Sequence, residues 1–382
     1  MFDPKTKFKL FKQHKHFCSA PWTVLYVGMN GYTKTCTNDY SKHNSLLENS
    51  IEEIVVNKEY QTLRSDILKD KVTDHCKRCL SFENKVSSEN FESIRNMYNL
   101  LSVDSDVDYE DVTQFKLNAV DLHWSSTCDL KCVTCWAGQS SSIAKEQGKT
   151  PVHTPTAIAD QIIKYIVANQ TELKEIYLSG GEPTLIKYNL KLLQQIEKRD
   201  DLLIRVNTNM QWNQDNAIMK EILKFPKVMM TCSVDGIGEK FNYIRRGGTW
   251  KKFSDNLDYL KTYQNVDIRA NTVFFVLTAQ ELPDIIDYFI EKQGAISHTV
   301  NMVSMGQDHL RCRHLPIDIK NRVRHSLKKA FEKYNHDLNI AGNLRNCINE
   351  LDHTGNNDYQ QYFDDIDLLQ GSNWRKLYPE LV

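Results

Sequence analysis

The chain has 382 residues, of which 41% are hydrophobic and 25% charged, so it can bury a sizeable core and is long enough for two or three domains. Its formal net charge of −1 gives no strong nucleic-acid signal and no field that attracts an anionic membrane. Its apolar runs are far shorter than the roughly 20 residues that span a bilayer, and its first residues lack a secretory h-region. We therefore expect a cytoplasmic protein with no membrane partner.

The first expected segment, residues 1–111, holds four of the ten cysteines. Cys18 comes first, Cys36 follows a small hairpin expected to turn at residues 29–31, and Cys76 and Cys79 form a C-x2-C pair. So many cysteines in a chain of this size favour metal ligation in a reducing compartment over disulfides. By number and spacing alone, these four bind zinc or a complete 4Fe–4S cluster equally well.

After a polar helical connector at 81–111, residues 112–310 alternate strand-like and helical patterns. The expected strands are 119–125, 175–179, 202–208, 228–234, 267–276 and 298–303. The expected helices between them are 156–168, 187–199, 215–223, 250–263 and 281–292. Six alternations with short connections predict an α/β fold with parallel strands, although periodicity alone does not separate an open sheet from a barrel.

Three cysteines follow the first of these strands at a C-x3-C-x2-C spacing: Cys128, Cys132 and Cys135. Three thiolates can bind three of the irons of a cube-shaped 4Fe–4S cluster and leave one iron without a protein ligand. A structural zinc site is the alternative, but it needs a fourth ligand that this segment lacks.

The later strand ends carry further polar motifs. The second strand ends in Gly180-Gly181-Glu182-Pro183, where glycines admit a closely approaching ligand and the carboxylate can accept from an ammonium group. Taken alone, a β–α turn explains this motif. The third strand ends with Asn207 and Asn209, and the fourth with Ser233 and Asp235, followed by Arg245. Arginine pairs a carboxylate through two hydrogen bonds, whereas Asp235 has the alternative role of capping the next turn.

Together, the cysteine triplet and the glycine-glycine-glutamate turn resemble the radical S-adenosylmethionine (radical SAM) enzymes. The resemblance implies a partial (β/α)6 TIM-like barrel with its chemistry at the carboxyl ends of the strands. It also implies that the triplet holds a SAM-binding 4Fe–4S cluster and that the glycine turn holds the methionine amino group. The remaining cofactor contacts implied by the resemblance are Asn207, Asn209, Ser233, Asp235 and Arg245.

The amino-terminal cysteines resemble those of SPASM and Twitch domains, which hold auxiliary 4Fe–4S clusters. Here they precede the barrel instead of following it. The resemblance implies a small cysteine-rich Twitch-like domain with an auxiliary cluster, and zinc stays open as the alternative. Residues 311–382 are expected to form a helical C-terminal tail that begins with a basic amphipathic helix at 317–334.

The resemblance further implies an enzyme that cleaves SAM reductively to a 5′-deoxyadenosyl radical, which abstracts hydrogen from a substrate. A flavodoxin or ferredoxin would donate the electron, and the auxiliary cluster would carry electrons. The first hypothesis for the substrate is a peptide or protein side chain. The second is a nucleotide, sugar or other small molecule, and the third is a non-enzymatic zinc or iron–sulfur scaffold protein.

No residue is assigned from the sequence as a substrate acid or base. The inward strand positions His123, Asn271 and Asn301 are candidates. For each, a satisfied polar group in the core is the alternative.

Overall fold

The computed structural model describes residues 14–39, 44–77, 79–80, 93–303, 305–355 and 359–381. The chain divides into two compact units. The first comprises Met1–Cys128, Thr150–Val206 and Asp215–Val228, and the second Asp129–Lys149, Asn207–Gln214 and Met229–Val382. The segment limits expected at residues 111 and 310 stay predictions.

In the first unit, the strand order is β3-β2-β1-β4-β5-β6. These strands are β1 (Val24–Val27), β2 (Tyr32–Lys34), β3 (Asn44–Ser45), β4 (Ala119–Leu122), β5 (Glu175–Leu178) and β6 (Leu203–Thr208, up to Val206). The hairpin expected at 29–31 is confirmed, because β1 and β2 pair antiparallel across Met29–Gly31. The pairs β4–β5 and β5–β6 are parallel.

Strand β1 also pairs in parallel with β4, which the sequence did not predict. All four residues of β1 are buried. A short run of this kind fits a strand that is covered on both faces, as in a parallel sheet. The cysteine-rich segment therefore contributes a strand to the same sheet as the first strand of the expected barrel.

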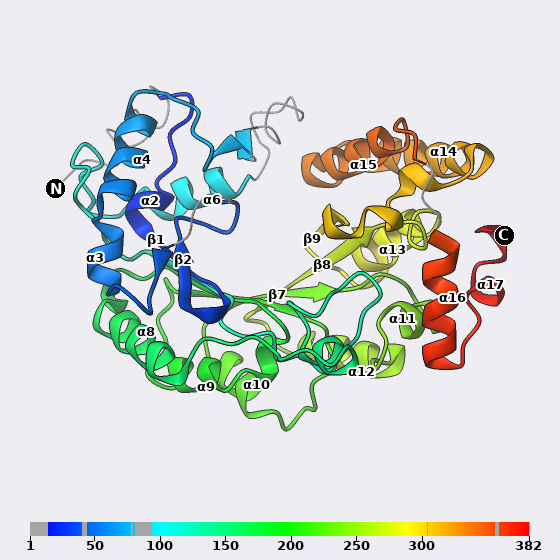
Figure 1. Ribbon diagram of the computed structural model, residues 1–382, viewed down its shortest axis with the longest axis horizontal. Helices are drawn as coiled ribbons and strands as arrows, with labels where there is room; N and C mark the ends of the chain where they lie inside the picture. The colour runs from blue at the N-terminus through cyan, green and yellow to red at the C-terminus, as the bar shows by residue number, and fades with distance from the viewer. Residues whose placement is uncertain are drawn as a thin grey trace. The chain divides into compact units, whose positions relative to one another are not determined.

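Helices α8, α9 and α10 lie side by side in this unit (Figure 1). Helix α8 spans the expected residues and buries Ala159, Ile162, Ile163 and Ile166, which form one stripe at helical spacing. The helices of the unit are α2 (Ala20–Thr23), α3 (Ile51–Val55), α4 (Lys58–Leu68), α6 (Ile94–Leu101), α8 (Thr156–Ala168), α9 (Lys187–Leu193) and α10 (Ala217–Ile222). Short 3-10 turns are η1 (Met29–Gly31), η2 (Gln170–Glu172) and η3 (Pro183–Leu185).

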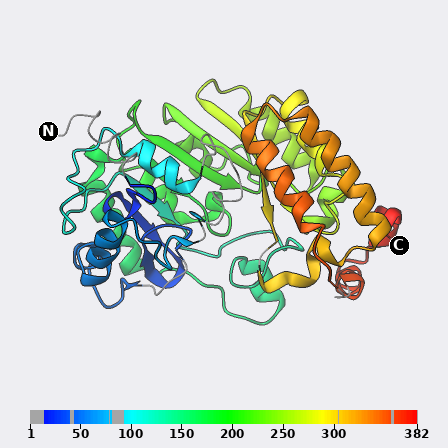
Figure 2. The same cartoon turned by 90° about the horizontal axis from the view of Figure 1, so that it is seen from above.

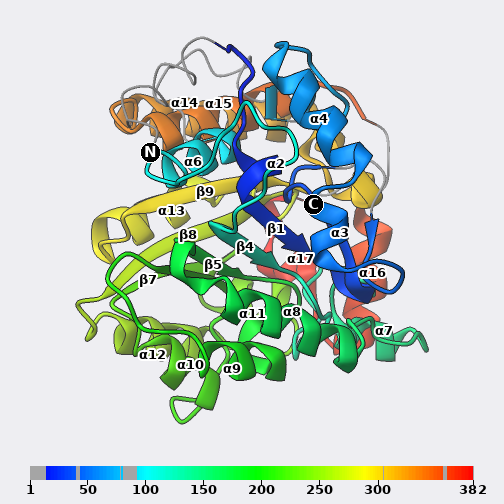
Figure 3. The ribbon, with the colours of Figure 1, turned by 90° about the vertical axis from the view of Figure 1, so that its left-hand side faces the viewer.

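The second unit contains β7 (Lys227–Ser233, from Met229 on), β8 (Val266–Phe274) and β9 (Ser297–Met302). Strands β8 and β9 pair in parallel and run side by side (Figure 3). The helices are α7 (Ser141–Glu146), α11 (Glu239–Ile244), α12 (Trp250–Leu260), α13 (Leu282–Asp287), α14 (Ile317–Lys333), α15 (Leu338–Glu350), α16 (Tyr359–Gln370) and α17 (Trp374–Leu377). Shorter turns are η4 (Tyr288–Lys292, a π-helical continuation of α13), η5 (Met305–Leu310), η6 (Cys312–His314) and η7 (Pro379–Leu381).

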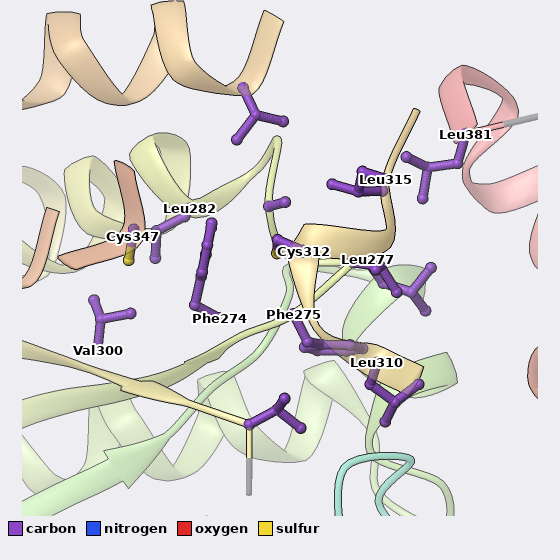
Figure 4. Packing of buried hydrophobic residues seen from close by; sticks show 14 of the residues in the cluster. Phe274, Phe275, Leu277, Leu282, Val300, Leu310, Cys312, Leu315, Cys347 and Leu381 are labelled. Atoms are coloured by element: carbon purple, nitrogen blue, oxygen red, sulfur yellow. The ribbon is translucent and has the colours of Figure 1, made fainter. Parts of the chain in front are cut away.

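The core of the second unit joins β8 and β9 to the carboxyl-terminal helices. Figure 4 shows part of it, including Phe274, Cys312 and Cys347. Helix α14 buries Val323 and Leu327 in this core and packs beside α15 (Figure 2). The carboxyl-terminal helices are therefore part of a packed core.

The strands and helices from β4 to β9 alternate in the order of a partial (β/α)6 TIM-like barrel, which confirms the expected fold class. The region after β9 is helical, as expected. None of the described helices is long and apolar enough to cross a membrane.

Candidate functional site

The glycine turn after β5 lies directly against the backbone that leads to Cys128. Gly181 N donates to Ser125 O at 2.9 Å, and Glu182 N donates to Thr127 O at 2.7 Å. A Cβ on Gly181 would lie 2.2 Å from Thr127 O. Gly180 has φ 109, which favours glycine, and its own Cβ would lie 2.8 Å from Ser125 O. The turn therefore needs both glycines for its close approach to the first cysteine's segment.

Glu182 is buried and takes part in the local structure of the turn. Its Oε1 accepts from Thr184 N at 3.1 Å and from Thr184 Oγ1 at 2.8 Å. Pro183 is buried at the first position of η3. The carboxylate that the sequence suggested for an ammonium group therefore also caps the short helix that follows it.

The division between the two units falls within the cysteine triplet, directly after Cys128. Cys128 belongs to the first unit with the glycine turn, and Cys132 and Cys135 belong to the second. Burial raises the pKa of the Cys132 thiol, and burial together with the charge of Cys132 raises the pKa of Cys135 to about 12. A positively charged metal cluster would favour the thiolates that this environment otherwise disfavours.

The loop around Cys132 and Cys135 is fixed by its backbone and by two apolar anchors. Leu130 and Val133 are both 1% exposed. Lys131 N donates to Arg246 O at 2.8 Å, and Val133 N donates to Ile244 O at 2.9 Å. These bonds hold the loop against the end of α11.

Arg245 links the fourth strand's end to this loop. Its Nη2 lies 2.7 Å from Asp235 Oδ2, and its Nη1 lies 4.0 Å from the Cys132 sulfur. The carboxylate of Asp235 also accepts from Val273 N at 2.8 Å. Asp235 thus binds the predicted arginine and the backbone of β8, and half-buried Ser233 lies at the end of β7.

The asparagines after the third strand occupy different positions. Asn209 is 7% exposed and donates from Nδ2 to Asp129 Oδ1 at 2.8 Å. Its Oδ1 accepts from Gln211 N at 2.8 Å. Asn207 is half-buried on β6. Asn209 therefore supports the cysteine loop through Asp129, a residue that the sequence did not indicate.

In the first unit, the structure brings the four amino-terminal cysteines together. Burial raises the pKa of Cys18 well above its usual range, and the charges of Cys76, Cys36 and Cys79 add to this effect. Burial likewise raises the pKa of Cys36 and of Cys76, with further contributions from neighbouring cysteines. Four thiols, of which Cys18 and Cys79 are buried and Cys36 and Cys76 partly buried, repel one another as thiolates and form a donor set suited to a cationic metal group.

Two asparagines hold this cysteine group. Asn99 on α6 accepts from Ser19 N at 2.8 Å and donates to Phe17 O at 3.1 Å, so it fixes the backbone on both sides of Cys18. Asn38 Nδ2 lies 3.3 Å from the Cys79 sulfur, at hydrogen-bonding distance. Single asparagines carry no spacing pattern, so neither residue could be identified from the sequence.

Within the described parts of the chain, no three His, Cys, Asp or Glu side chains surround one point closely enough for a single metal ion. A 4Fe–4S cube binds each cysteine through a different iron, so its ligands enclose a larger volume than those of one ion. The buried and partly buried thiols and the glycine turn fit such a group.

The three candidate substrate positions differ. Asn271 and Asn301 bind each other, with Nδ2 of the latter 2.8 Å from Oδ1 of the former. His123 stacks on Tyr26 with a ring-centroid distance of 5.3 Å, and its Nε2 lies 3.4 Å from Asp121 Oδ1. Asn301 is exposed and Asn271 is half-buried, so this pair is not a polar group of the core.

The family model of the radical SAM superfamily matches residues 122–289, and that of the SPASM iron–sulfur cluster-binding domain matches residues 18–80. The two domains imply a 4Fe–4S cluster with SAM in the first and an auxiliary iron–sulfur cluster in the second.

Among curated proteins, a GTP 3′,8-cyclase of Marinobacter nauticus is 26% identical over 218 residues, which are 56% of this chain and 63% of that protein. A GTP 3′,8-cyclase of Rhizobium etli is 24% identical over 243 residues, 61% of this chain and 64% of that protein. The chain thus spans just under two thirds of the length of these relatives.

Among solved structures, Streptococcus suis SuiB bound to precursor peptide SuiA has a TM-score of 0.44 and 18% identity, covering 76% of this chain and 62% of that chain. Native anSMEcpe with bound AdoMet has a TM-score of 0.44 and 20% identity, covering 57% of this chain and 61% of that chain. Similarities at this level support no argument about function.

Proposed function

Because the chain belongs to the radical SAM superfamily, with a SPASM domain ahead of its radical SAM domain, we propose that it is an enzyme that cleaves SAM reductively and abstracts hydrogen from a substrate. The observation that carries the proposal is the glycine turn packed against the segment before Cys128, since a zinc or iron–sulfur scaffold has no need of it.

The residues that would hold the catalytic cluster are Cys128, Cys132 and Cys135. When bound, the cluster supplies the electron that cleaves SAM and so generates the radical that attacks the substrate. Gly180, Gly181, Glu182 and Pro183 would form the backbone cradle for the amino group of SAM.

Arg245 would orient the cosubstrate, and Asp235 would hold Arg245 in place through their ion pair. The ion pair of 2.7 Å holds the guanidinium, and Asp235 is itself fixed by the backbone of β8. A guanidinium fixed in this way can present its remaining N–H groups to a carboxylate or ribose hydroxyl with little further loss of side-chain entropy. We also assign cosubstrate contacts to Asn207, Asn209 and Ser233, because these residues lie at strand ends that resemble those of radical SAM enzymes.

We assign an auxiliary 4Fe–4S cluster, and not zinc, to Cys18, Cys36, Cys76 and Cys79. The match of residues 18–80 to an iron–sulfur cluster-binding domain supports this choice. With four protein ligands, such a cluster has no open iron, so its role would be electron transfer or structure. A flavodoxin or ferredoxin is the proposed electron donor.

For the substrate, we propose a peptide or protein side chain, the common task of SPASM relatives. A nucleotide is the second candidate, and it is favoured by the name of the two cyclase relatives. Incubation of the reconstituted chain with GTP and SAM separates the two. A cyclised nucleotide product would select the second candidate, whereas unchanged GTP would reject that reaction.

Anaerobic reconstitution of the full chain tests the proposal. Two 4Fe–4S clusters require about eight irons per chain, and dithionite with SAM should then yield 5′-deoxyadenosine. Alanine at Cys128, Cys132 or Cys135 should abolish this product, whereas alanine at Cys76 or Cys79 should spare some uncoupled cleavage. Two zinc ions per chain with no 5′-deoxyadenosine would overturn the proposal in favour of a scaffold protein.

A further inference from the structure

Two side chains from late in the sequence bind the backbone of the cysteine loop. Tyr362 on α16 donates its hydroxyl to Val133 O at 2.7 Å, although the residues are 229 positions apart. Gln307 on η5 donates from Nε2 to Cys135 O at 3.2 Å and to Val133 O at 3.4 Å. Because Val133 lies between Cys132 and Cys135, both donors act on the short segment that joins these thiols.

Both donors are held firmly. The ring of Tyr362 packs against His309 at a centroid distance of 4.7 Å and against Phe363 at 5.4 Å. Burial, with the charge of Cys135 adding to it, raises the pKa of Tyr362 to about 12, so the hydroxyl keeps its proton near neutral pH. Gln307 is 8% exposed. A buried carbonyl that loses a donor is left desolvated without compensation, so the loop depends on the three hydrogen bonds from these two side chains.

Hydrogen bonds and solvent exposure around the ligands set the reduction potential of an iron–sulfur cluster. We propose that Tyr362 and Gln307 are positioning residues for the catalytic cluster: they fix the segment between Cys132 and Cys135 and thereby tune the cluster's potential and retention. The inference rests on the proposed function, because it requires a cluster at the triplet. It gives the carboxyl-terminal helices a part in the active site.

The test compares Tyr362→Phe with Tyr378→Phe in the anaerobically reconstituted full chain. Tyr378 is a matched control, because it is a 1% exposed tyrosine of the same core whose hydroxyl has no hydrogen-bond partner among the described residues. The readouts are the paramagnetic resonance signal that responds to SAM, the midpoint potential of that cluster, and its loss of iron to a chelator. The thermal midpoint of the cluster-free chain is measured alongside.

We expect Tyr362→Phe to shift the signal and the potential and to release iron about five-fold faster, the factor for one lost hydrogen bond of ordinary strength. Tyr378→Phe should change none of these. If Tyr362→Phe does not fold, Gln307→Leu is measured in the same way and should show the same changes. Signals, potentials and iron release equal to those of the unchanged chain would overturn the inference while the proposed function stands. An unchanged chain that takes up no SAM-responsive cluster would overturn the proposed function itself, and this inference with it.

Discussion

Replacing Gly181 by alanine tests the close packing of the glycine turn most directly. The new Cβ would lie 2.2 Å from Thr127 O and 2.7 Å from both the carbonyl carbon and the oxygen of Ser126. All three atoms belong to backbone, so no side-chain rotation relieves the overlap. The segments are also joined by two hydrogen bonds, from Gly181 N to Ser125 O at 2.9 Å and from Glu182 N to Thr127 O at 2.7 Å. The overlap therefore forces the turn away from the chain leading to the first cysteine.

The expected cost follows from these contacts. Overpacking at a tight site costs about 1–3 kcal/mol, and each weakened backbone hydrogen bond adds about 1 kcal/mol. We therefore expect Gly181→Ala to lower the free energy of unfolding of the first unit by about 3–5 kcal/mol. The matched control is Gly306→Ala, since nothing lies within 4 Å of a Cβ built there. An open exposed site of this kind should change stability by less than about 0.5 kcal/mol.

Both variants are measured in the cluster-free chain by urea unfolding, with fluorescence and circular dichroism as separate probes because two units need not unfold together. After reconstitution, Gly181→Ala should also form little 5′-deoxyadenosine. Equal unfolding midpoints for Gly181→Ala and Gly306→Ala would refute the packing argument, because a real clash with backbone cannot be free of cost.

Three other predictions concern charge and metal content. Burial lowers the pKa of His298 to about 3, so near pH 5 the unfolded chain binds a proton that the folded chain does not. The free energy of unfolding should therefore fall by about 2 kcal/mol between pH 7 and pH 5. Unfolding of His298→Asn at both pH values should show a smaller fall, and an equal fall would contradict this assignment. Asp235→Ala leaves the guanidinium of Arg245, which is 9% exposed, without its carboxylate and should lower the free energy of unfolding by about 3–5 kcal/mol. The control Asp255→Ala removes an exposed ion pair and should lower it by less than about 0.5 kcal/mol. Urea unfolding midpoints measure both changes. Cys76→Ala should lose about four irons on reconstitution, whereas Cys232→Ala, a fully buried strand residue, should lose none; equal iron contents would remove Cys76 from the ligand set.

The strand–helix alternation was predictable because its signals are local. Helix α8 occupies the expected residues, and the six expected strands all occur with ends shifted by at most three positions. In β6, β7 and β8, buried residues alternate with less buried ones, and the sequence carries this alternation directly. Helix α9 ends at Leu193, earlier than expected, although Ile196 beyond it is still buried. Because Ile196 is buried, the apolar spacing typical of a helix continues in the sequence after the helix has ended at Leu193.

The missed features are those that depend on long-range pairing. The parallel pairing of β1 with β4 joins residues about 95 positions apart, and no local pattern marks it. Asn99 and Tyr362 are single polar side chains whose roles appear only when distant backbone comes within reach. Motif spacing therefore located the candidate ligands, whereas the residues that hold those ligands in place came from the fold.

The two hydrogen bonds that Asn99 makes on either side of Cys18 have a consequence for when the cysteine group forms during folding. The amino-terminal cysteines leave the ribosome early, but Asn99, which binds the backbone on both sides of Cys18, follows about 80 positions later, and Arg95, which also binds Phe17 O, comes almost as late. The neighbouring strand β1 gains its parallel partner only when β4 has been made. Contacts between such distant positions form late, because a long loop must close first. The cysteine group at the start of the chain is thus synthesised first and completed late, so its metal centre is best loaded after most of the first unit has folded.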